Sequence, residues 1–358
     1  RRARARGMAA GKSTAPRYAA AVPRLGRARM PDTPGGGPRP RRPPTYPGDV
    51  PRSPLALAAL ATVAVPGLDA YDVRRPLEGG SEYDVALVTD AEQRHWVVRA
   101  PADAAAGAAL EAEVVLLGAL AAQVDAGTLP FEVPRPAGFA HLDEGGRAVV
   151  HRLVPGRPLR LEALTPGPGL SAGLGRALGA LHQLPTSIVE NAGRPVYDAP
   201  TYRQRRQAEV DEAAKTGKVP NGLLRRWEKK LEDVRLWRFQ PTVVHGDLTA
   251  SHVLVHDGDV SGILDWGDAM VADPADDLAW LLVAAPPDAV ESILEAYLLR
   301  RTELTDPFLT DRALLAGELA LARWLLYGVR SGQQDVVDDA FAMLLDLDEQ
   351  TTELESVS

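Results

Sequence analysis

Residues 243–255 read VVHGDLTASHVLV, and residues 262–266 read GILDW. Both stretches contain short runs of β-branched and aliphatic residues, which predict buried strands. An Asp follows or ends a run in each stretch, at Asp247 and Asp265. Phosphoryl transfer needs such carboxylates, because one must accept the proton of an attacking hydroxyl while others hold Mg²⁺ against nucleotide phosphates. We therefore predict a catalytic loop at Asp247 and a metal-binding turn at Asp265, with His252 beside the metal.

The predicted catalytic loop also carries a family resemblance. His245, Gly246 and Asp247, with a His five residues later, resemble the catalytic loop of the aminoglycoside phosphotransferase-like kinases. In that family, small hydroxylated molecules replace protein substrates on a protein-kinase-like fold. The GILDW stretch is similar to the family's counterpart of the kinase Asp-Phe-Gly turn. The family usually has Asn where this chain has His252, and a His at that position is similar to the macrolide 2'-phosphotransferase branch.

The resemblance implies an α+β, bilobal protein-kinase-like fold. A small β-rich N-lobe that binds nucleotide would span residues 51–153, and a larger, mainly helical C-lobe for catalysis and substrate binding would span residues 154–350. The resemblance also implies that His252 and Asp265 bind Mg²⁺, the former directly or through water, and that His245 supports the loop.

A glycine turn separates two predicted strands of the small lobe, one around Val73 and one at residues 84–89. This turn, formed by Gly79, Gly80 and Ser81, lies where a kinase-like fold has its phosphate loop. Glycines let a backbone approach phosphates and present its N–H groups. Taken alone, two adjacent glycines mark only a turn.

Arg99 ends the next predicted strand, at the position of the phosphate-contacting Lys of kinases. A guanidinium can hold a phosphate through two hydrogen bonds and stays charged, although a solvent-exposed arginine is an equal alternative. In a predicted helix at residues 104–122, Glu113 interrupts an apolar stripe. A carboxylate there needs a cationic partner, so we predict an ion pair between Glu113 and Arg99. Glu111, on a less apolar face, is the alternative.

Residues 131–136 and 147–153 are predicted as the last strands of the small lobe. The Val-Pro-Gly-Arg-Pro segment that follows breaks the pattern, as a hinge between lobes would. Kinase-like folds bind the nucleobase through the hinge backbone, so the resemblance implies purine contacts from His151, Leu153 and Val154.

Beyond the hinge, the sequence predicts helices at residues 170–184, 202–215 and 223–234. Residues 273–279 read DPADDLA, which resembles the family's Asp-Pro-x-x-Asp-Leu-Ala motif. The resemblance implies that Asp277 accepts backbone N–H groups of the catalytic loop. An acidic helix N-terminus that complements the helix dipole is the alternative.

The chain has 358 residues, 45% hydrophobic and 25% charged, which suits a globular protein with two domains. It has no Cys, which excludes disulfides, thiolate zinc sites and a cysteine nucleophile. Residues 1–50 hold 12 Lys/Arg and 2 Asp/Glu, so the net charge of −8 divides into +10 there and −18 in the remainder. We expect residues 1–50 to be a disordered, basic, Pro/Gly-rich tail, with Met8 or Met30 as a possible start.

The acidic remainder argues against a nucleic-acid groove and suits an amine-bearing substrate, although acidity for solubility explains it equally well. No uninterrupted run approaches the roughly 18 apolar residues of a membrane span. We therefore expect a cytoplasmic monomer that binds neither nucleic acid nor membrane.

The residues and the resemblance together predict a kinase that transfers the γ-phosphate of GTP to the 2'-hydroxyl of the amino sugar of a macrolide antibiotic, inactivating it. ATP is the alternative donor. Macrolides are large and mostly apolar with one amine, so we expect an apolar pocket with a nearby carboxylate. Candidate lining residues on apolar helix faces are Trp280, Leu281, Leu325 and Tyr327.

Other functions remain as alternatives to the macrolide kinase. An aminoglycoside kinase, or a choline- or sugar-type kinase using ATP, would share the same catalytic loop. A nucleotide-binding pseudokinase is more remote, because Asp247 and Asp265 are both present. A metal hydrolase with His245, Asp247, His252 and Asp265 as ligands is disfavoured, because this set has no His pair at i, i+4 on a helix and the segment between them reads as a loop that leads into a strand. A serine hydrolase is not expected either.

Overall fold

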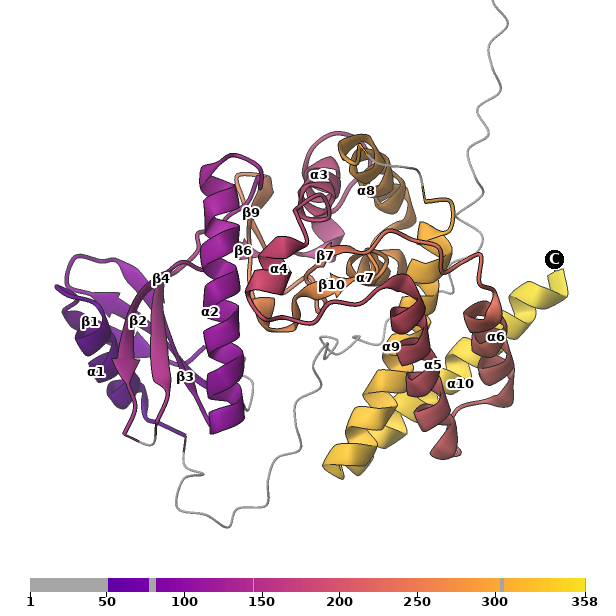
Figure 1. The fold of residues 1–358 in the computed structure, drawn as a ribbon, viewed down its shortest axis with the longest axis horizontal. Coiled ribbons are helices and arrows are strands. Elements are labelled where there is room, and N and C mark those ends of the chain that lie inside the picture. Colours follow the sequence, from indigo (N-terminus) through magenta and orange to yellow (C-terminus); the bar gives the residue numbers. More distant parts are fainter. Residues whose placement is uncertain (1–50, 77–81, 144, 303–305, 358) are drawn as a thin grey trace, which may run out of the picture.

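The computed structural model describes residues 51–76, 82–143, 145–302 and 306–357. The predicted tail at residues 1–50 and the predicted phosphate-loop residues Gly79, Gly80 and Ser81 lie outside the described residues. An N-terminal part rich in strands is followed by a larger helical part (Figure 1). The α+β, two-lobed, kinase-like fold class is therefore confirmed.

A five-stranded antiparallel sheet forms the N-terminal lobe, with strand order β1-β2-β3-β5-β4. One face of the sheet packs on α1 (Pro54–Ala64), and Leu57 of this helix belongs to the same buried cluster as Val88, Val98 and Val150. The Ser53 side chain caps the start of α1 by accepting the Ala56 N–H at 3.1 Å. The strands are β1 (Ala70–Arg74), β2 (Tyr83–Asp90), β3 (His95–Pro101), β4 (Pro136–His141) and β5 (Arg147–Arg152).

Helix α2 (Ala104–Asp125) stands between the sheet and the helical lobe (Figure 1). It is three residues longer than predicted, and Asp103 caps its first turn by accepting the Ala106 N–H at 2.8 Å. Its length and mean hydropathy would also suit a membrane span, alone among the described helices. Here it contacts β3 and β4 of the sheet and α4 (Ser187–Asn191) of the helical lobe, so it packs between the lobes.

One strand prediction was wrong. Residues 131–135 are not a strand of the sheet, and Glu132 makes only an isolated bridge to Gly262. The strand in this region is β4, which starts at Pro136. Pro134 lacks the N–H that a regular ladder requires, and pairing with β5 begins at Pro136, which lies opposite His151.

The predicted catalytic loop connects two short strands of the helical lobe. Strand β7 (Thr242–Val244) pairs with β10 (Met270–Ala272), and β8 (Val253–His256) lies between β6 (Arg157–Pro158) and β9 (Asp259–Ile263). Both valine-rich runs of the opening stretch are thus buried strands, as predicted.

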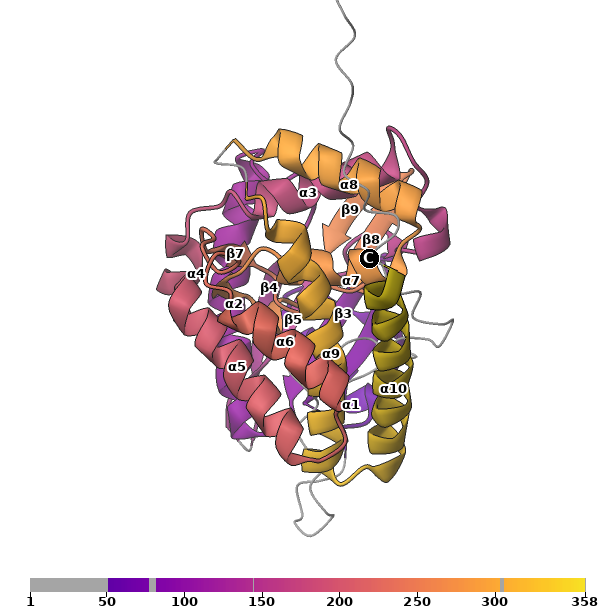
Figure 2. The ribbon, with the colours of Figure 1, turned by 90° about the vertical axis from the view of Figure 1, so that its right-hand side faces the viewer.

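The helices of this lobe form two groups. Helices α3 (Leu170–Leu181) and α8 (Pro287–Arg300) pack on one side, and α5, α6, α9 and α10 lie side by side on another (Figure 2). The helices predicted from residue 170 to 234 are confirmed within a few residues. The remaining bounds are α5 (Ala199–Lys215), α6 (Asn221–Glu232), α7 (Asp276–Ala284), α9 (Leu309–Ser331) and α10 (Gln334–Val357), with short 3₁₀ turns η2 (Leu161–Ala163) and η3 (Trp266–Asp268).

Candidate active site

The first turn of α7 holds the loop after β7 through hydrogen bonds to the loop backbone. Asp277 accepts the backbone N–H of His245 at 2.8 Å and that of Gly246 at 3.0 Å. Gly246 has φ +85°, and a Cβ at this position would lie 2.4 Å from the carbonyl oxygen of Asp268. Only glycine fits this conformation and this contact. The predicted support of the loop by Asp277 is therefore present.

Two buried histidines complete this support. His245 donates from Nε2 to the Leu264 carbonyl at 2.8 Å and accepts the Asp247 N–H on Nδ1 at 3.3 Å. Burial lowers the pKa of His245, which favours the neutral tautomer that these two bonds require. His182 donates to Asp277 at 3.1 Å and contacts the Tyr297 hydroxyl at 2.9 Å. Both imidazoles thus have their hydrogen bonds inside the protein, around the loop.

His252 links the catalytic loop to the predicted metal turn. Its Nδ1 donates to the main-chain carbonyl of Asp247 at 2.7 Å, which leaves the lone pair of a neutral imidazole on Nε2. That Nε2 lies 3.6 Å from Oδ2 of Asp265. The side chains of His252 and Asp265 thus meet at one place, next to the residue predicted as the base.

The Asp265 side chain projects from a strained turn. Its backbone has φ +62°, a left-handed conformation that is unusual for a residue other than glycine, and its side chain is 53% exposed. The next residue, Trp266, is fully buried and packs 4.9 Å from the His245 ring. This anchored turn presents the carboxylate to solvent, where a ligand can reach it.

The residues present fit a magnesium ion that is completed by a nucleotide. Among the described residues, no group of three His, Asp or Glu side chains could hold a metal alone. Mg²⁺ is usually bound through one or two carboxylates, with waters and substrate phosphates at the other positions. Asp265 would supply such a carboxylate, His252 would bind directly or through water, and phosphate oxygens and water would take the remaining positions.

The predicted ion pair of the N-terminal lobe is present. Nη1 of Arg99 donates to Oε1 of Glu113 at 2.7 Å, and the Glu113 side chain is fully buried. Burial alone would lower the pKa of Arg99, but Glu113 and Asp265 raise it above its usual value, so the guanidinium stays charged. The alternative, Glu111, pairs instead with Arg147. The choice of Glu113 over Glu111 is confirmed, and its role in phosphate binding stays a prediction.

Replacing Glu113 with Gln should raise the KM for the nucleotide about tenfold or more, because Arg99 loses its charged, buried partner. Glu111→Gln is the matched control, because it makes the same chemical change on the same helix at a more exposed pair. We expect it to change this KM by less than about twofold. Steady-state kinetics with varied nucleotide measure both. Equal effects of the two substitutions would contradict the assignment.

The hinge residues lie between the lobes, but their side chains are mostly engaged. His151 is buried, its Nδ1 donates to the Arg152 carbonyl at 2.9 Å, and burial lowers its pKa to about 4. The Leu153 N–H donates to the main-chain carbonyl of His95 at 2.9 Å, while the residue as a whole is 41% exposed. Val154 is buried. The predicted purine contacts therefore cannot use the Leu153 N–H, which belongs to the sheet.

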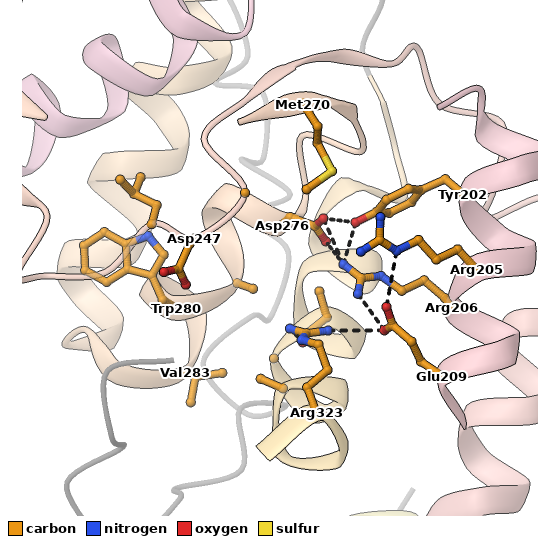
Figure 3. Close-up of a pocket in the computed structure, with 16 residues that line it drawn as sticks. Tyr202, Arg205, Arg206, Glu209, Asp247, Met270, Asp276, Trp280, Val283 and Arg323 are labelled. Carbon is orange, nitrogen blue, oxygen red and sulfur yellow. Dashed lines mark hydrogen bonds and ion pairs between the residues drawn. The ribbon is translucent and has the colours of Figure 1, made fainter. Parts of the chain in front are cut away.

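A cavity opens beside Asp247 and is bordered by one face each of α5, α7 and α9 (Figure 3). Trp280 lines it, as predicted, but Leu281, Leu325 and Tyr327 do not. Leu281 and Leu325 are buried in the core, because neighbouring positions on a helix point about 100° apart. The Tyr327 hydroxyl accepts a hydrogen bond from Gln333 at 2.7 Å, outside the lining.

Sequence reasoning did not identify the charged residues that form one wall of this cavity. Tyr202, Arg206 and Glu209 lie at i, i+4 and i+7 on α5, and Asp276 and Arg323 face them from α7 and α9. Charged residues on a helix usually indicate a solvated face, and those of α5 carry no other signal in composition alone. The regular spacing of Tyr202, Arg206 and Glu209 was the available signal, since it places all three on one helix face.

Residues 169–173 read GLSAG and match the Gly-x-Ser-x-Gly pattern of serine hydrolases, which sequence reasoning overlooked. Ser171 lies at the start of α3, is buried, and donates its hydroxyl to the Thr165 carbonyl at 2.6 Å. A nucleophilic serine needs an exposed hydroxyl beside a base. The match therefore indicates no hydrolase site.

Asp268 is a half-buried carboxylate in the turn after Asp265. Burial and the charge of Asp265 raise its pKa to about 6, although Arg194 acts in the opposite direction. Since the folded pKa exceeds the ordinary value near 4, the folded state binds the proton more tightly than the unfolded chain does. The free energy of unfolding therefore falls as the pH rises from about 4 to about 6, because Asp268 must lose its proton in a site that disfavours the charge. Above about pH 6 this penalty on stability is complete.

Replacing Asp268 with Asn should remove this penalty. We expect the free energy of unfolding of metal-free protein to rise by about 1 to 2 kcal/mol at pH 7.5, after discounting for partial exposure, and to change little at pH 4. Urea unfolding at both pH values, with a chelator present, measures it. A gain of the same size at both pH values would show that the pKa of Asp268 is ordinary.

Comparison with known proteins adds to this geometry. A model described as the phosphotransferase enzyme family matches residues 73–313. An uncharacterised protein of Bacillus subtilis (strain 168), YcbJ, is 28% identical over 204 residues, which cover 56% of this chain and 66% of that protein, slightly less than two thirds of its length.

Several solved structures share the fold. The apoenzyme of macrolide 2'-phosphotransferase MphH from Brachybacterium faecium aligns with a TM-score of 0.65 at 25% identity, over 78% of this chain and 93% of that one. A macrolide 2'-phosphotransferase type I aligns at 0.67 and 25%, over 82% and 98%. The GDP complex of aminoglycoside 2'-phosphotransferase-IIIa aligns at 0.68 and 21%, over 84% and 100%, which supports the fold alone.

Proposed function

The chain belongs to the phosphotransferase enzyme family, and we propose that it is a kinase that phosphorylates the 2'-hydroxyl of the amino sugar of a macrolide antibiotic, and so inactivates it. One observation carries the proposal of a working kinase. Asp247 lines a cavity, and its own main chain holds His252, whose other nitrogen lies 3.6 Å from Asp265. A base for the acceptor and ligands for a nucleotide-bound cation thus meet at one site.

The roles follow from the chemistry of each side chain. Asp247 orients the acceptor hydroxyl and accepts its proton. Asp265 and His252 would hold Mg²⁺, which supplies positive charge against the phosphates when it is bound. Arg99, positioned by Glu113, binds phosphate oxygens and neutralises the charge that develops during transfer. The tight support of the loop by Asp277 keeps Asp247 in place during this step.

The character of the cavity favours a macrolide over an aminoglycoside. Its lining includes Trp280, Met270 and Val283, together with small residues of α9, and these suit an apolar acceptor. The α5 wall is charged instead of apolar, which differs from the sequence prediction. Even so, three arginines and three carboxylates line the cavity, so it does not present the surplus of carboxylates that an aminoglycoside with several ammonium groups requires.

Two further properties belong to this proposal. We propose GTP as the donor because of the resemblance to the macrolide branch, with ATP as the alternative. We also propose that the enzyme works as a cytoplasmic monomer, where nucleoside triphosphates are available.

An acceptor screen tests the proposed function. Nucleotide consumption is measured with erythromycin, kanamycin and choline, each with GTP and with ATP, and products are identified by mass spectrometry. We expect turnover with erythromycin and GTP, and a product carrying one phosphoryl group on the amino sugar. Absence of turnover with any macrolide would reject the macrolide assignment, and turnover with kanamycin alone would replace it with the aminoglycoside alternative.

A further inference from the structure

Arg206 is a buried cation at the acceptor cavity, across from Asp247 (Figure 3). It is 7% exposed and projects from α5, between the carboxylates of Asp276 and Glu209. A charge is seldom buried to this extent unless partners compensate the loss of water. The partners that compensate the charge of Arg206 therefore bear on its role in the cavity.

The Arg206 guanidinium forms hydrogen bonds with two carboxylates, those of Asp276 and Glu209. Its Nη2 lies 2.8 and 2.9 Å from the two oxygens of Asp276, and its Nη1 donates to Glu209 at 2.8 Å. The Tyr202 hydroxyl also donates to Asp276. Charge-assisted bonds in this arrangement are the strong kind, and the planar guanidinium provides donors for both acids.

Both acids face the cavity, and the neighbouring arginines keep Glu209 ionised. Burial raises the pKa of Glu209, but Arg206 and Arg323 outweigh it and lower the pKa to about 2. Asp276 lies in the first turn of α7, where the helix dipole favours a negative charge. Two neighbouring carboxylates at a cavity wall are the arrangement that recognises ammonium groups.

The balance of charge in the cavity depends on this one residue. Arg205, Arg206 and Arg323 face Asp247, Glu209 and Asp276 in the lining. Removing Arg206 would leave an excess of one negative charge, in a partly desolvated site where charges interact more strongly than in water. The other two arginines are less suited to replace it, because each approaches Glu209 only at 3.5 to 3.6 Å.

We infer that Arg206 is a specificity-determining residue whose guanidinium occupies the place that an ammonium group of a polycationic acceptor would take. The inference rests on the proposed function, which makes this cavity the acceptor site. Because Asp276 and Glu209 are already paired within the protein, an acceptor with many amines gains little there. An acceptor with one amine and a large apolar surface loses nothing.

The test measures the affinity of kanamycin for the full chain by calorimetry at low salt, and needs no turnover. Arg206→Gln should bind kanamycin about tenfold or more tightly than wild type, because two carboxylates become available. Erythromycin, with one amine, should change by less than about threefold. Arg203→Gln is the matched control, because it removes the same charge from α5 at a side chain that instead donates to the Leu231 carbonyl. It should leave kanamycin affinity unchanged.

Two more variants separate charge from damage to the fold. Arg206→Gln with Asp276→Asn removes one charge of each sign, and kanamycin affinity should return to the wild-type value. Arg206→Lys keeps a charge and should fold even where the Gln variant does not. The single ammonium group of a lysine cannot bond both Asp276 and Glu209 as the guanidinium does. We therefore expect Arg206→Lys to bind kanamycin about threefold more tightly than wild type.

The outcomes are distinct from those of the acceptor screen. Unchanged kanamycin affinity in a folded Arg206→Gln protein, or in Arg206→Lys when the former is unfolded, would overturn the inference. Equal tightening in Arg203→Gln, or tightening that persists in the double variant, would overturn it as well. Failure of wild type to phosphorylate erythromycin would reject the proposed function, whereas the change in kanamycin affinity tests Arg206 regardless.

Discussion

Replacing Asp247 with Asn is expected to lower kcat by about 10²- to 10⁴-fold, the largest loss of activity predicted for this chain. The amide has the size of the carboxylate but cannot accept the proton of the acceptor hydroxyl. The backbone contacts of Asp247 to His245 and His252 do not involve its side chain, so the loop should keep its shape. Steady-state kinetics with saturating acceptor and nucleotide measure the loss.

Binding of nucleotide provides the control for this variant. Since Asp247 is assigned to the acceptor and not to the phosphates, the Kd of the nucleotide should stay within about threefold of wild type. Asp265→Asn should behave in the opposite way and weaken magnesium-dependent nucleotide binding. Turnover that is unchanged in Asp247→Asn would show that another group is the base.

Replacing Asp277 with Ala is expected to cost about 3 to 5 kcal/mol of the free energy of unfolding, the largest loss of stability predicted here. This fully buried carboxylate accepts hydrogen bonds from the His245 and Gly246 N–H groups and from His182. Alanine would leave all three donors buried without an acceptor. Activity should also fall, because the released loop no longer holds Asp247. Urea unfolding and kcat measure the two effects.

Asp277→Asn distinguishes the lost hydrogen bonds from the lost charge. The amide oxygen can still accept one of the loop N–H groups, so we expect a smaller loss of stability than with Ala. An alanine variant with wild-type stability and kcat would mean that the acidic residues of α7 serve only the helix dipole. That was the alternative that the sequence left open.

Local features of the site were predictable from sequence because short-range patterns determine them. The valine-rich runs around Asp247 became β7 and β8, since β-branched side chains suit buried strands. Glu113 was assigned correctly because a carboxylate on the apolar stripe of a helix is buried and needs a partner. The strand at residues 131–136 was placed wrongly, since apolar character alone does not reveal which residues can donate to a ladder.

The sequence by itself determined the two-lobed class of fold, the loop that carries Asp247, and Asp277 as the acid that supports this loop. Only the tertiary structure decided what surrounds the acceptor. Arg206 and Asp276 are 70 positions apart and meet because α5 and α7 turn particular faces toward the same space. Helical periodicity gives the residues that share a face, but the packing of all helices together sets the direction of each face. The charge of the cavity, on which the proposed choice of substrate rests, depends on that packing.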